Sequence, residues 1–358
     1  MEKIRKSNSP SEYWKTVKSV TLTAENEDLV LHEKGKIVTD DNEIANIMCP
    51  FFKEKVEDIE SKIPRVNISP TSKLEESLKD KNLNFSLKTV TEAQVKKAIR
   101  SLKNKSSSGV DFISPKIVKL AADIIAIPLT AVINSSISQG EFPDSWKWAK
   151  VIPVYKKKGS KFEKKNYRPV SLLKSSSKVL EIIINQQVLQ YAETSGILPK
   201  SQFGFRARRS TSNAIATMHD MWLRNWRDGK SQTLTCFDLS SAFDTLSSEI
   251  FTSKLKIYGF DQKSRNFFTS YLSERKQVVI VGASISKPVT TSIGSPQGAV
   301  LSTTCFILLV ADIGLWTKSE VFSYADDTCS TLNGGNLEVL IKSCEEEAQK
   351  IINYMSIN

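Results

Sequence analysis

Residues 322–328, Phe-Ser-Tyr-Ala-Asp-Asp-Thr, constrain the fold most, because they place two adjacent carboxylates between short segments that favour extended backbone. Phe322 and Thr328 are typical of strands, whereas Asp326 and Asp327 tolerate tight-turn conformations. The stretch therefore predicts a strand, a turn and a second strand. Adjacent unpaired carboxylates repel, and a compact fold tolerates them best in water, beside basic side chains or around divalent cations. An exposed acidic turn is the alternative interpretation.

The net charge of the chain indicates a polyanionic partner. Its 358 residues include 50 Lys and Arg against 39 Asp and Glu, which gives +11 at pH 7. With 40% hydrophobic residues the chain can bury a substantial core, divided into more than one structural unit. The basic residues concentrate in residues 147–168 and again in 206–209, which is more than a solvated helix face needs.

Cysteine usage and hydropathy indicate an intracellular protein. The five cysteines are odd in number and widely spaced, as expected of reduced, buried thiols. With two histidines and no Cys-x-x-Cys pair, a structural zinc site is not expected. No apolar run has membrane-spanning length, and the N-terminus lacks a signal-peptide core. We expect a location in the nucleus and/or cytoplasm, without secretion or membrane association.

A basic hairpin is predicted over residues 151–173. Residues 151–155 are β-prone and run into a lysine-rich turn, and the chain returns through Arg168 and Pro169. The proline argues against a regular central strand at that point. Such a hairpin fits over phosphate groups, and a solvated lysine-rich loop is the alternative.

Aromatic and arginine side chains are interleaved in residues 202–211. Aromatic rings stack on bases while arginines hold phosphates. The pattern predicts a contact with nucleic acid through Gln202, Arg206, Arg208 and Arg209.

A second acidic motif ends a predicted strand over residues 231–238. A strand that delivers Asp238 at its tip and then turns into a helix presents an oxygen ligand for a cation. It also offers the backbone N–H groups of residues 239–243 to an anion such as a triphosphate. A helix cap is the alternative role of Asp238. Farther along, Gln297 precedes a buried helix and is placed to touch a ligand.

Taken in order, these motifs resemble the reverse transcriptase family, and most closely the reverse transcriptases of non-LTR (LINE-type) retrotransposons. The resemblance runs from about Thr91 to the end, and residues 11–60 are similar to the connector that precedes the polymerase in such elements. The residues that carry it are 166–173 with Lys178 and Glu181, 202–211, 237–245, 294–302 and 324–327.

The resemblance implies an α+β right-hand polymerase fold (reverse transcriptase fingers and palm) with the thumb missing. The composition of residues 1–85, rich in Lys, Glu, Ser and Asn with scattered apolar helical stretches, predicts a partly helical, loosely packed extension or connector before the reverse transcriptase domain. The expected boundaries are 1–85 for the extension, 86–358 for the domain, about 86–230 and 250–293 for the fingers, and about 231–249 and 294–358 for the palm.

The activity implied is RNA-directed DNA synthesis, in which two Mg²⁺ ions, with Mn²⁺ as a substitute, assist nucleotidyl transfer from dNTPs to a primer 3′-hydroxyl. Asp238 and Asp326 would be the principal metal ligands, assisted by the Phe237 carbonyl and by Asp327. The implied partners are an RNA template, a DNA primer and dNTPs, without a membrane, and the oligomeric state is left open.

The resemblance also implies the substrate-binding residues. Arg168 and Lys157 would hold the incoming triphosphate. Phe243, beside Ala242, would lie beneath the sugar and exclude a ribose 2′-hydroxyl. Gln297 and Gly298 would contact the nucleotide or the nascent pair, while residues 202–209 would border the template path.

Two departures from the family pattern leave the metal ligands in place. Thr303 stands where many relatives carry proline, and Ser247 and Ser248 replace a frequent Asp-His. The chain ends before the segment in which a thumb is expected, so it is interpreted as a fragment whose activity alone stays open. A group II intron-type or domesticated enzyme is one alternative, and a catalytically inactive RNA-binding remnant or scaffold is another.

Overall fold

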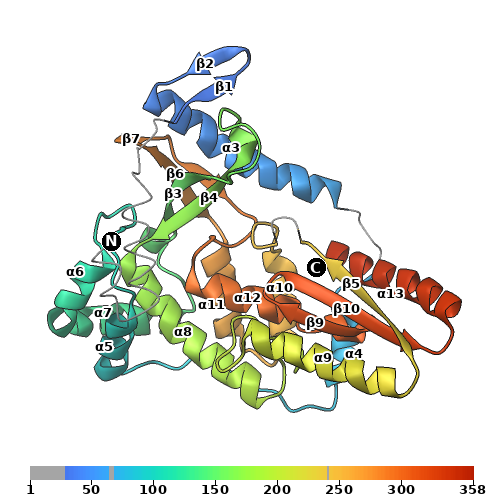
Figure 1. Cartoon of the computed structure of the whole chain (residues 1–358). Helices are drawn as coiled ribbons and strands as arrows, with labels where there is room; N and C mark the ends of the chain where they lie inside the picture. The colour runs from blue at the N-terminus through green and yellow to red at the C-terminus, as the bar shows by residue number, and fades with distance from the viewer. Residues whose placement is uncertain (1–28, 64–67, 240–241) are drawn as a thin grey trace, which may run out of the picture.

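The computed structural model describes residues 29–63, 68–239 and 242–358 and shows a mixed α and β architecture (Figure 1). Two sheets lie on either side of a group of helices, and an N-terminal hairpin with a long helix stands beside the first sheet. The mixed composition agrees with the expected α+β class. The division into fingers and palm stays a prediction.

The first sheet carries the basic hairpin. Its strands run in the order β4-β3-β6-β7, with β8 also paired to β6, and β3 pairs with β6 in parallel. Val154 lies opposite Arg168 in the antiparallel β3–β4 pair, so the predicted hairpin is confirmed. Pro169 is tolerated because β4 is an edge strand. The strands are β3 (Trp148–Tyr155), β4 (Tyr167–Leu173), β6 (Arg275–Val281), β7 (Ser284–Ile285) and β8 (Val289–Thr291).

The N-terminal part packs closely against this sheet. A hairpin of β1 (Leu31–Glu33) and β2 (Lys36–Val38) leads to α3 (Asp41–Lys62), whose first turn is capped by the Asp40 carboxylate accepting from the Glu43 N–H at 2.8 Å. Ile44, Met48 and Phe52 are buried in one cluster with Val151 and Val279 of the sheet. Its attachment is therefore closer than the loosely packed connector expected from the sequence.

Helices form the largest core. Thr91 begins α5 with a capping box to Gln94, and Val95 and Ile99 are buried, as the pattern predicts. Helix α12 is buried along most of its length and is largely apolar, as expected of a helix that other elements cover. The helices of this part are α4 (Ser72–Leu78), α5 (Glu92–Ser101), α6 (Pro115–Leu120), α7 (Ala122–Gln139), α8 (Ser175–Thr194), α10 (Ser248–Ile257), α11 (Gln262–Leu272) and α12 (Val300–Leu309), with the 3₁₀ turns η1 (Asp144–Trp146), η2 (Lys164–Asn166) and η3 (Ile313–Leu315).

The second sheet is a three-stranded layer between two helices. Its order is β5-β10-β9, all antiparallel, formed by β5 (Ser231–Phe237), β9 (Glu320–Tyr324) and β10 (Asp327–Gly334). Side chains alternate between its faces, so Phe322 packs towards α9 (Thr211–Arg227) and Val321 packs towards α13 (Leu337–Ile357).

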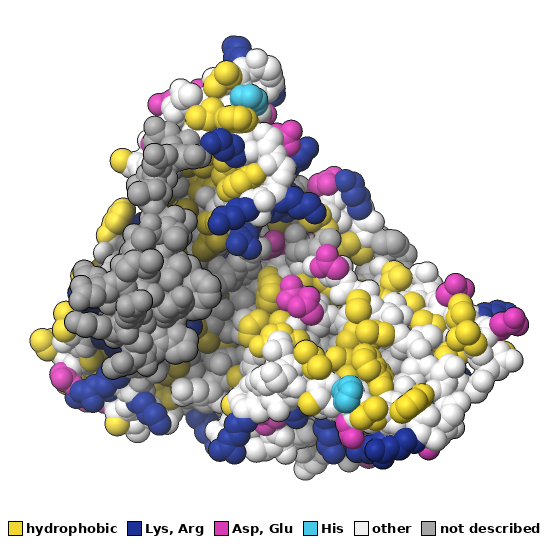
Figure 2. Space-filling model, in the orientation of Figure 1, with side chains coloured by type: hydrophobic (Ala, Val, Ile, Leu, Met, Phe, Trp, Pro, Cys, Tyr) yellow, Lys and Arg dark blue, Asp and Glu magenta, His cyan; other side chains and the backbone are white. Residues whose placement is uncertain are grey.

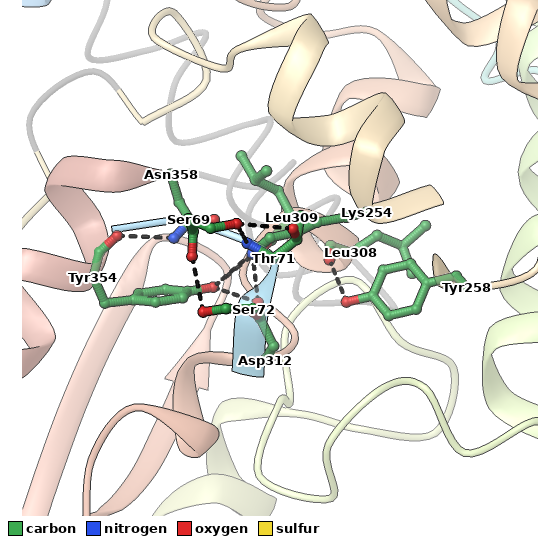
Figure 3. A network of polar contacts seen from close by, with 10 residues as sticks. All are labelled: Ser69, Thr71, Ser72, Lys254, Tyr258, Leu308, Leu309, Asp312, Tyr354 and Asn358. Atoms are coloured by element: carbon green, nitrogen blue, oxygen red, sulfur yellow. Dashed lines mark hydrogen bonds and ion pairs between the residues drawn. The ribbon is translucent and has the colours of Figure 1, made fainter. Parts of the chain in front are cut away.

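A buried polar network ties α13 to the helical core (Figure 3). The Lys254 ammonium donates to Asp312 Oδ1 at 2.6 Å and to the Leu309 carbonyl at 2.7 Å, and the Tyr354 hydroxyl donates to Asp312 Oδ1 at 2.7 Å. The side chains of Lys254 and Asp312 are fully buried. Burial lowers the pKa of Lys254 and raises that of Tyr354, while the Asp312 charge favours the ammonium form.

Across the described residues, the helices are all too short or too polar to cross a bilayer.

Candidate active site

The predicted acidic turn is present between β9 and β10. Tyr324 pairs with Asp327, which leaves Ala325 and Asp326 as a two-residue turn. Ala325 has φ 61°, a left-handed conformation that glycine adopts at lower cost. The turn holds Asp326 half-buried and Asp327 exposed at the end of the sheet.

Asp238 reaches the same end of the sheet from a distant part of the chain. Phe237, the last residue of β5, lies opposite Thr328. Continuing the antiparallel register by one residue places Asp238 beside Asp327. The two acidic segments therefore end at the same edge of the sheet.

Nothing in the described part of the chain neutralises these three carboxylates. Asp238 and Asp327 are exposed, and neither they nor Asp326 form a hydrogen bond or an ion pair through the side chain with another described residue. Three unpaired acids favour a cation between them because their mutual repulsion is otherwise uncompensated. Oxygen donors of this kind suit a hard divalent cation.

Carboxylate oxygens are suitable ligands for such an ion, but the three side chains are not arranged around a common metal position. Among residues 29–63, 68–239 and 242–358, no group of three or more His, Cys, Asp or Glu side chains is close enough together to hold a metal. The structure therefore shows the acids at one edge of the sheet and does not show a metal centre. The roles of Asp238, Phe237, Asp326 and Asp327 as ligands stay predictions.

The loop after β5 is bonded to the glycine-rich turn that holds Gln297. The Gln297 amide donates to both oxygens of Asp244, at 2.8 and 2.7 Å. The backbone N–H of Ser295 donates to the Phe243 carbonyl at 2.8 Å. Burial raises the pKa of Asp244, while the Gln297 hydrogen bond and the charge of Lys55 act in the opposite direction. Sequence reasoning named Gln297 but did not select Asp244, although the short spacing from Asp238 was a usable signal.

Glycine at position 294 permits this contact. Its φ is 76°, and a Cβ there would lie 2.2 Å from the Asp244 carbonyl oxygen. A larger residue would separate the two loops, so Gly294 keeps Asp244 within reach of Gln297.

Phe243 lies between Phe205, in the aromatic and arginine segment 202–211, and Phe306 of the helical core. Its ring is 6.3 Å from Phe205 at an edge-on angle of 74° and 5.1 Å from Phe306 of α12. Both Phe243 and the neighbouring Ala242 are half-buried and pack against the largest core cluster. The ring has a fixed position because it is supported on two sides.

Glu181 positions the start of α12, and thereby the residues before it. Its buried carboxylate accepts from the backbone N–H of Val300 at 2.7 Å and from the Ser177 hydroxyl at 2.9 Å. Burial raises the pKa of Glu181, and these hydrogen bonds oppose that shift. The capped helix end fixes the path of Gln297 and Gly298 two to three residues upstream.

The predicted nucleic-acid segment packs directly against the acidic turn. The Phe203 N–H donates to the Ser323 carbonyl at 2.7 Å, and the Ser323 N–H donates to the Ser201 carbonyl at 3.0 Å. A Cβ on Gly204 would lie 2.1 Å from the Ala325 nitrogen, so glycine is needed for this approach. The segment from Ser201 to Gly204 therefore buttresses the turn.

Its four predicted contact residues divide into two kinds. Gln202 is 3% exposed and its side-chain oxygen accepts from the Gly204 N–H. Arg206 is 9% exposed and donates to Glu193 at 2.7 Å and to the Pro199 carbonyl at 2.6 Å. These two side chains are engaged inside the protein. Arg208 is exposed, and Arg209 is half-buried over the Phe203 ring.

The basic hairpin presents its charges to solvent. Lys157 stands at the tip with φ 58°, and Arg168 is exposed on β4. The tip is held by the Asn166 amide, which donates to the Ser160 carbonyl at 2.8 Å. Figure 2 shows dark blue side chains gathered above the hollow at the centre of this face, across from a group of magenta ones. The face thus opposes positive and negative charge across one hollow.

Residues 155–357 match the family described as reverse transcriptase (RNA-dependent DNA polymerase). Among the similar proteins from Drosophila melanogaster, the probable RNA-directed DNA polymerase from transposon BS is 26% identical over 96% of this chain and 38% of its own length. The RNA-directed DNA polymerase from mobile element jockey is 28% identical over 78% of this chain and 32% of its own length. The probable RNA-directed DNA polymerase from transposon X-element is 30% identical over 66% of this chain.

This chain spans well under half the length of each of these relatives, 38% in the longest match. The matched family region contains the turn and the second strand of the basic hairpin, both acidic motifs and the glycine-rich turn.

Proposed function

Because the chain belongs to the reverse transcriptase family, of the type found in non-LTR, LINE-type retrotransposons, we propose that it catalyses RNA-directed DNA synthesis. An RNA template, a DNA primer and dNTPs are the proposed substrates. The observation that supports this most is the β5–β10 register, which brings Asp238 to the Asp326–Asp327 turn.

Asp238, Asp326 and Asp327, with the Phe237 carbonyl, would hold two Mg²⁺ ions at this edge. Such ions lower the pKa of the primer 3′-hydroxyl and neutralise the charge that develops on the triphosphate. The protein contributes rigidity, because β10 is paired on both sides and the turn is held by residues 201–204. The carboxylates therefore keep their places while the nucleic acid moves.

The remaining residues would bind and orient the nucleotide. Lys157 and Arg168 project from the hairpin and would hold the triphosphate by charge-assisted contacts. Phe243, with Ala242, would exclude a ribose 2′-hydroxyl because its ring is supported by Phe205 and Phe306 and cannot retreat. Gln297 and Gly298 would line the base pair.

Along the template path, Arg208 is the residue best placed to touch phosphate, and Arg209 would assist it. Gln202 and Arg206 would act by holding the shape of the segment. We propose that the fingers comprise about 86–230 and 250–293, with the β3–β4 hairpin, and that the palm comprises about 231–249 and 294–358, with the β5-β10-β9 sheet.

Primer extension tests the proposal. The chain, and a version extended at its C-terminus by the thumb of a relative, are given poly(rA)/oligo(dT), dTTP and Mg²⁺. Extension that is lost in Asp326→Asn/Asp327→Asn and kept in the control Asp80→Asn would support polymerase activity. Asp80 is an exposed carboxylate far from the acidic edge in sequence. Silence of both wild-type versions would favour an inactive RNA-binding remnant.

A further inference from the structure

Helix α3 turns one side towards the candidate site. Phe52, Lys55 and Val56, spaced as neighbours on one helix face, line a cavity that is also lined by Ser171 of β4 and by Gln297. The apolar residues of α3 are held in the sheet cluster, so the position of Lys55 is fixed by packing. Figure 1 shows α3 running alongside β6 and the β3–β4 hairpin.

Lys55 differs from the other lysines of this helix in having no ionic partner within the described chain. It is half-buried. Lys53 pairs with Glu57 at 3.5 Å, and Lys62 pairs with Asp58 at 2.6 Å. Its charge acts on the Asp244 carboxylate without forming an ion pair with it, so the ammonium stays available to an anion in the cavity.

Two cations of the basic hairpin lie near this side of α3. Burial, and then the charges of Lys55 and Arg168, lower the pKa of Lys156, so Lys156 is within electrostatic reach of both. None of the ion pairs among the described residues includes any of the three. Asp244, which also lines the cavity, is half-buried and already accepts two hydrogen bonds from Gln297.

We propose that Lys55 is a phosphate-binding residue that α3 contributes to the site, acting together with Lys156 and Arg168. The proposal deepens the polymerase function given above and rests on it. The ligand chemistry is a phosphate, which either the dNTP triphosphate or the phosphodiester backbone of the template supplies. In both cases the helix preceding the family-matched region supplies a charge to the site.

Binding measurements on the full chain test this assignment without requiring catalysis. Fluorescence anisotropy is recorded with a labelled RNA/DNA primer–template, with and without a 5′ RNA overhang, and with a fluorescent dTTP analogue. The variants are Lys55→Gln and the charge-retaining Lys55→Arg, and Lys62→Gln is the control with the same change of net charge on the same helix.

We expect Lys55→Gln to weaken binding of one probe about 5- to 10-fold and to reduce its salt slope by about 1, with recovery in Lys55→Arg. If only the primer–template with the 5′ RNA overhang binds more weakly, Lys55 contacts the template. If only the dTTP analogue binds more weakly, Lys55 contacts the triphosphate. Equal binding by Lys55→Gln and Lys62→Gln would overturn the proposal, as would failure of the wild type to bind either probe. If these binding effects are observed but the wild-type chain does not extend a primer, the polymerase function is contradicted and the role of Lys55 is not.

Discussion

Two acidic regions of this molecule differ in exposure and in bonding. At the end of the second sheet, Asp238 and Asp327 are exposed, with no partner in the described chain. Asp312, which precedes the turn in the chain, is fully buried, and its Oδ1 accepts from Lys254 and Tyr354. The comparison separates carboxylates that are free to bind a ligand from a carboxylate that holds the fold together.

The largest effect should come from the exposed region and should be on activity alone. We expect Asp238→Asn to lower primer extension by about 10³-fold or more, because losing the proposed metal ligand would remove several kcal/mol of transition-state stabilisation. Thermal unfolding should show an unchanged or slightly raised Tm, since one repulsive charge is removed. A clear fall in Tm would break the comparison, and Asp80→Asn is the control.

The buried region should give the opposite result. Lys254→Met leaves the Asp312 carboxylate buried without its cation, and Asp312 Oδ2 already has no hydrogen-bond partner among the described residues. We expect a loss of about 3–5 kcal/mol in the free energy of unfolding, measured by urea denaturation. Lys256→Met on the exposed side of the same helix should change it little. Equal stability of the two variants would show that the network contributes nothing.

Glu347 on α13 is a second buried carboxylate, and its contribution to stability should depend on pH. Burial alone would raise its pKa, but hydrogen bonds from Lys350, the Lys318 N–H and Thr317 lower it to about 2. A carboxylate whose pKa is lower in the folded than in the unfolded state stabilises the fold at every pH above its unfolded pKa of about 4.3. This contribution is lost as the pH falls towards the folded pKa of about 2. We expect Glu347→Gln to lose about 2 kcal/mol at pH 7 and to flatten the acid limb of the stability curve.

Denaturation midpoints recorded between pH 2 and pH 7 check this expectation. The exposed Glu346→Gln is the matched control. Parallel pH profiles for wild type and Glu347→Gln would contradict the assigned hydrogen bonds.

The smallest effect concerns the acidic turn itself. Ala325→Gly should raise the free energy of unfolding by up to about 1 kcal/mol, because glycine adopts the φ of 61° without the cost that alanine incurs. Ala207→Gly, at an exposed position without positive φ, should be neutral or destabilising. Destabilisation by Ala325→Gly would argue against this turn geometry.

Local features of the fold were predictable from the sequence, and long-range ones were not. The acidic turn, the basic hairpin and the Thr91 capping box depend on residues a few positions apart. The Lys254–Asp312 pair joins residues 58 positions apart, and no periodicity marks it.

Some features of the candidate site could also be predicted from the sequence and others could not. Strand propensity and motif order predict that Asp238 lies near Asp326, whereas the Asp244–Gln297 contact depends on how two loops meet. Sequence also could not distinguish Arg206, which is paired internally with Glu193, from the exposed Arg208. An arginine-rich segment specifies charge, and tertiary packing decides which of its members remain available to a ligand.

The attachment of α3 to the first sheet has a consequence for synthesis on the ribosome. The Cys49 thiol contacts the Gln277 carbonyl, 228 positions farther along the chain. At about 5–20 residues per second, the partner strand is made roughly 10–50 seconds after the helix. Throughout that interval the apolar side of α3 lacks β6 and is covered at most by the earlier strands β3 and β4, so nascent chains are exposed to aggregation and chaperone capture until β6 emerges.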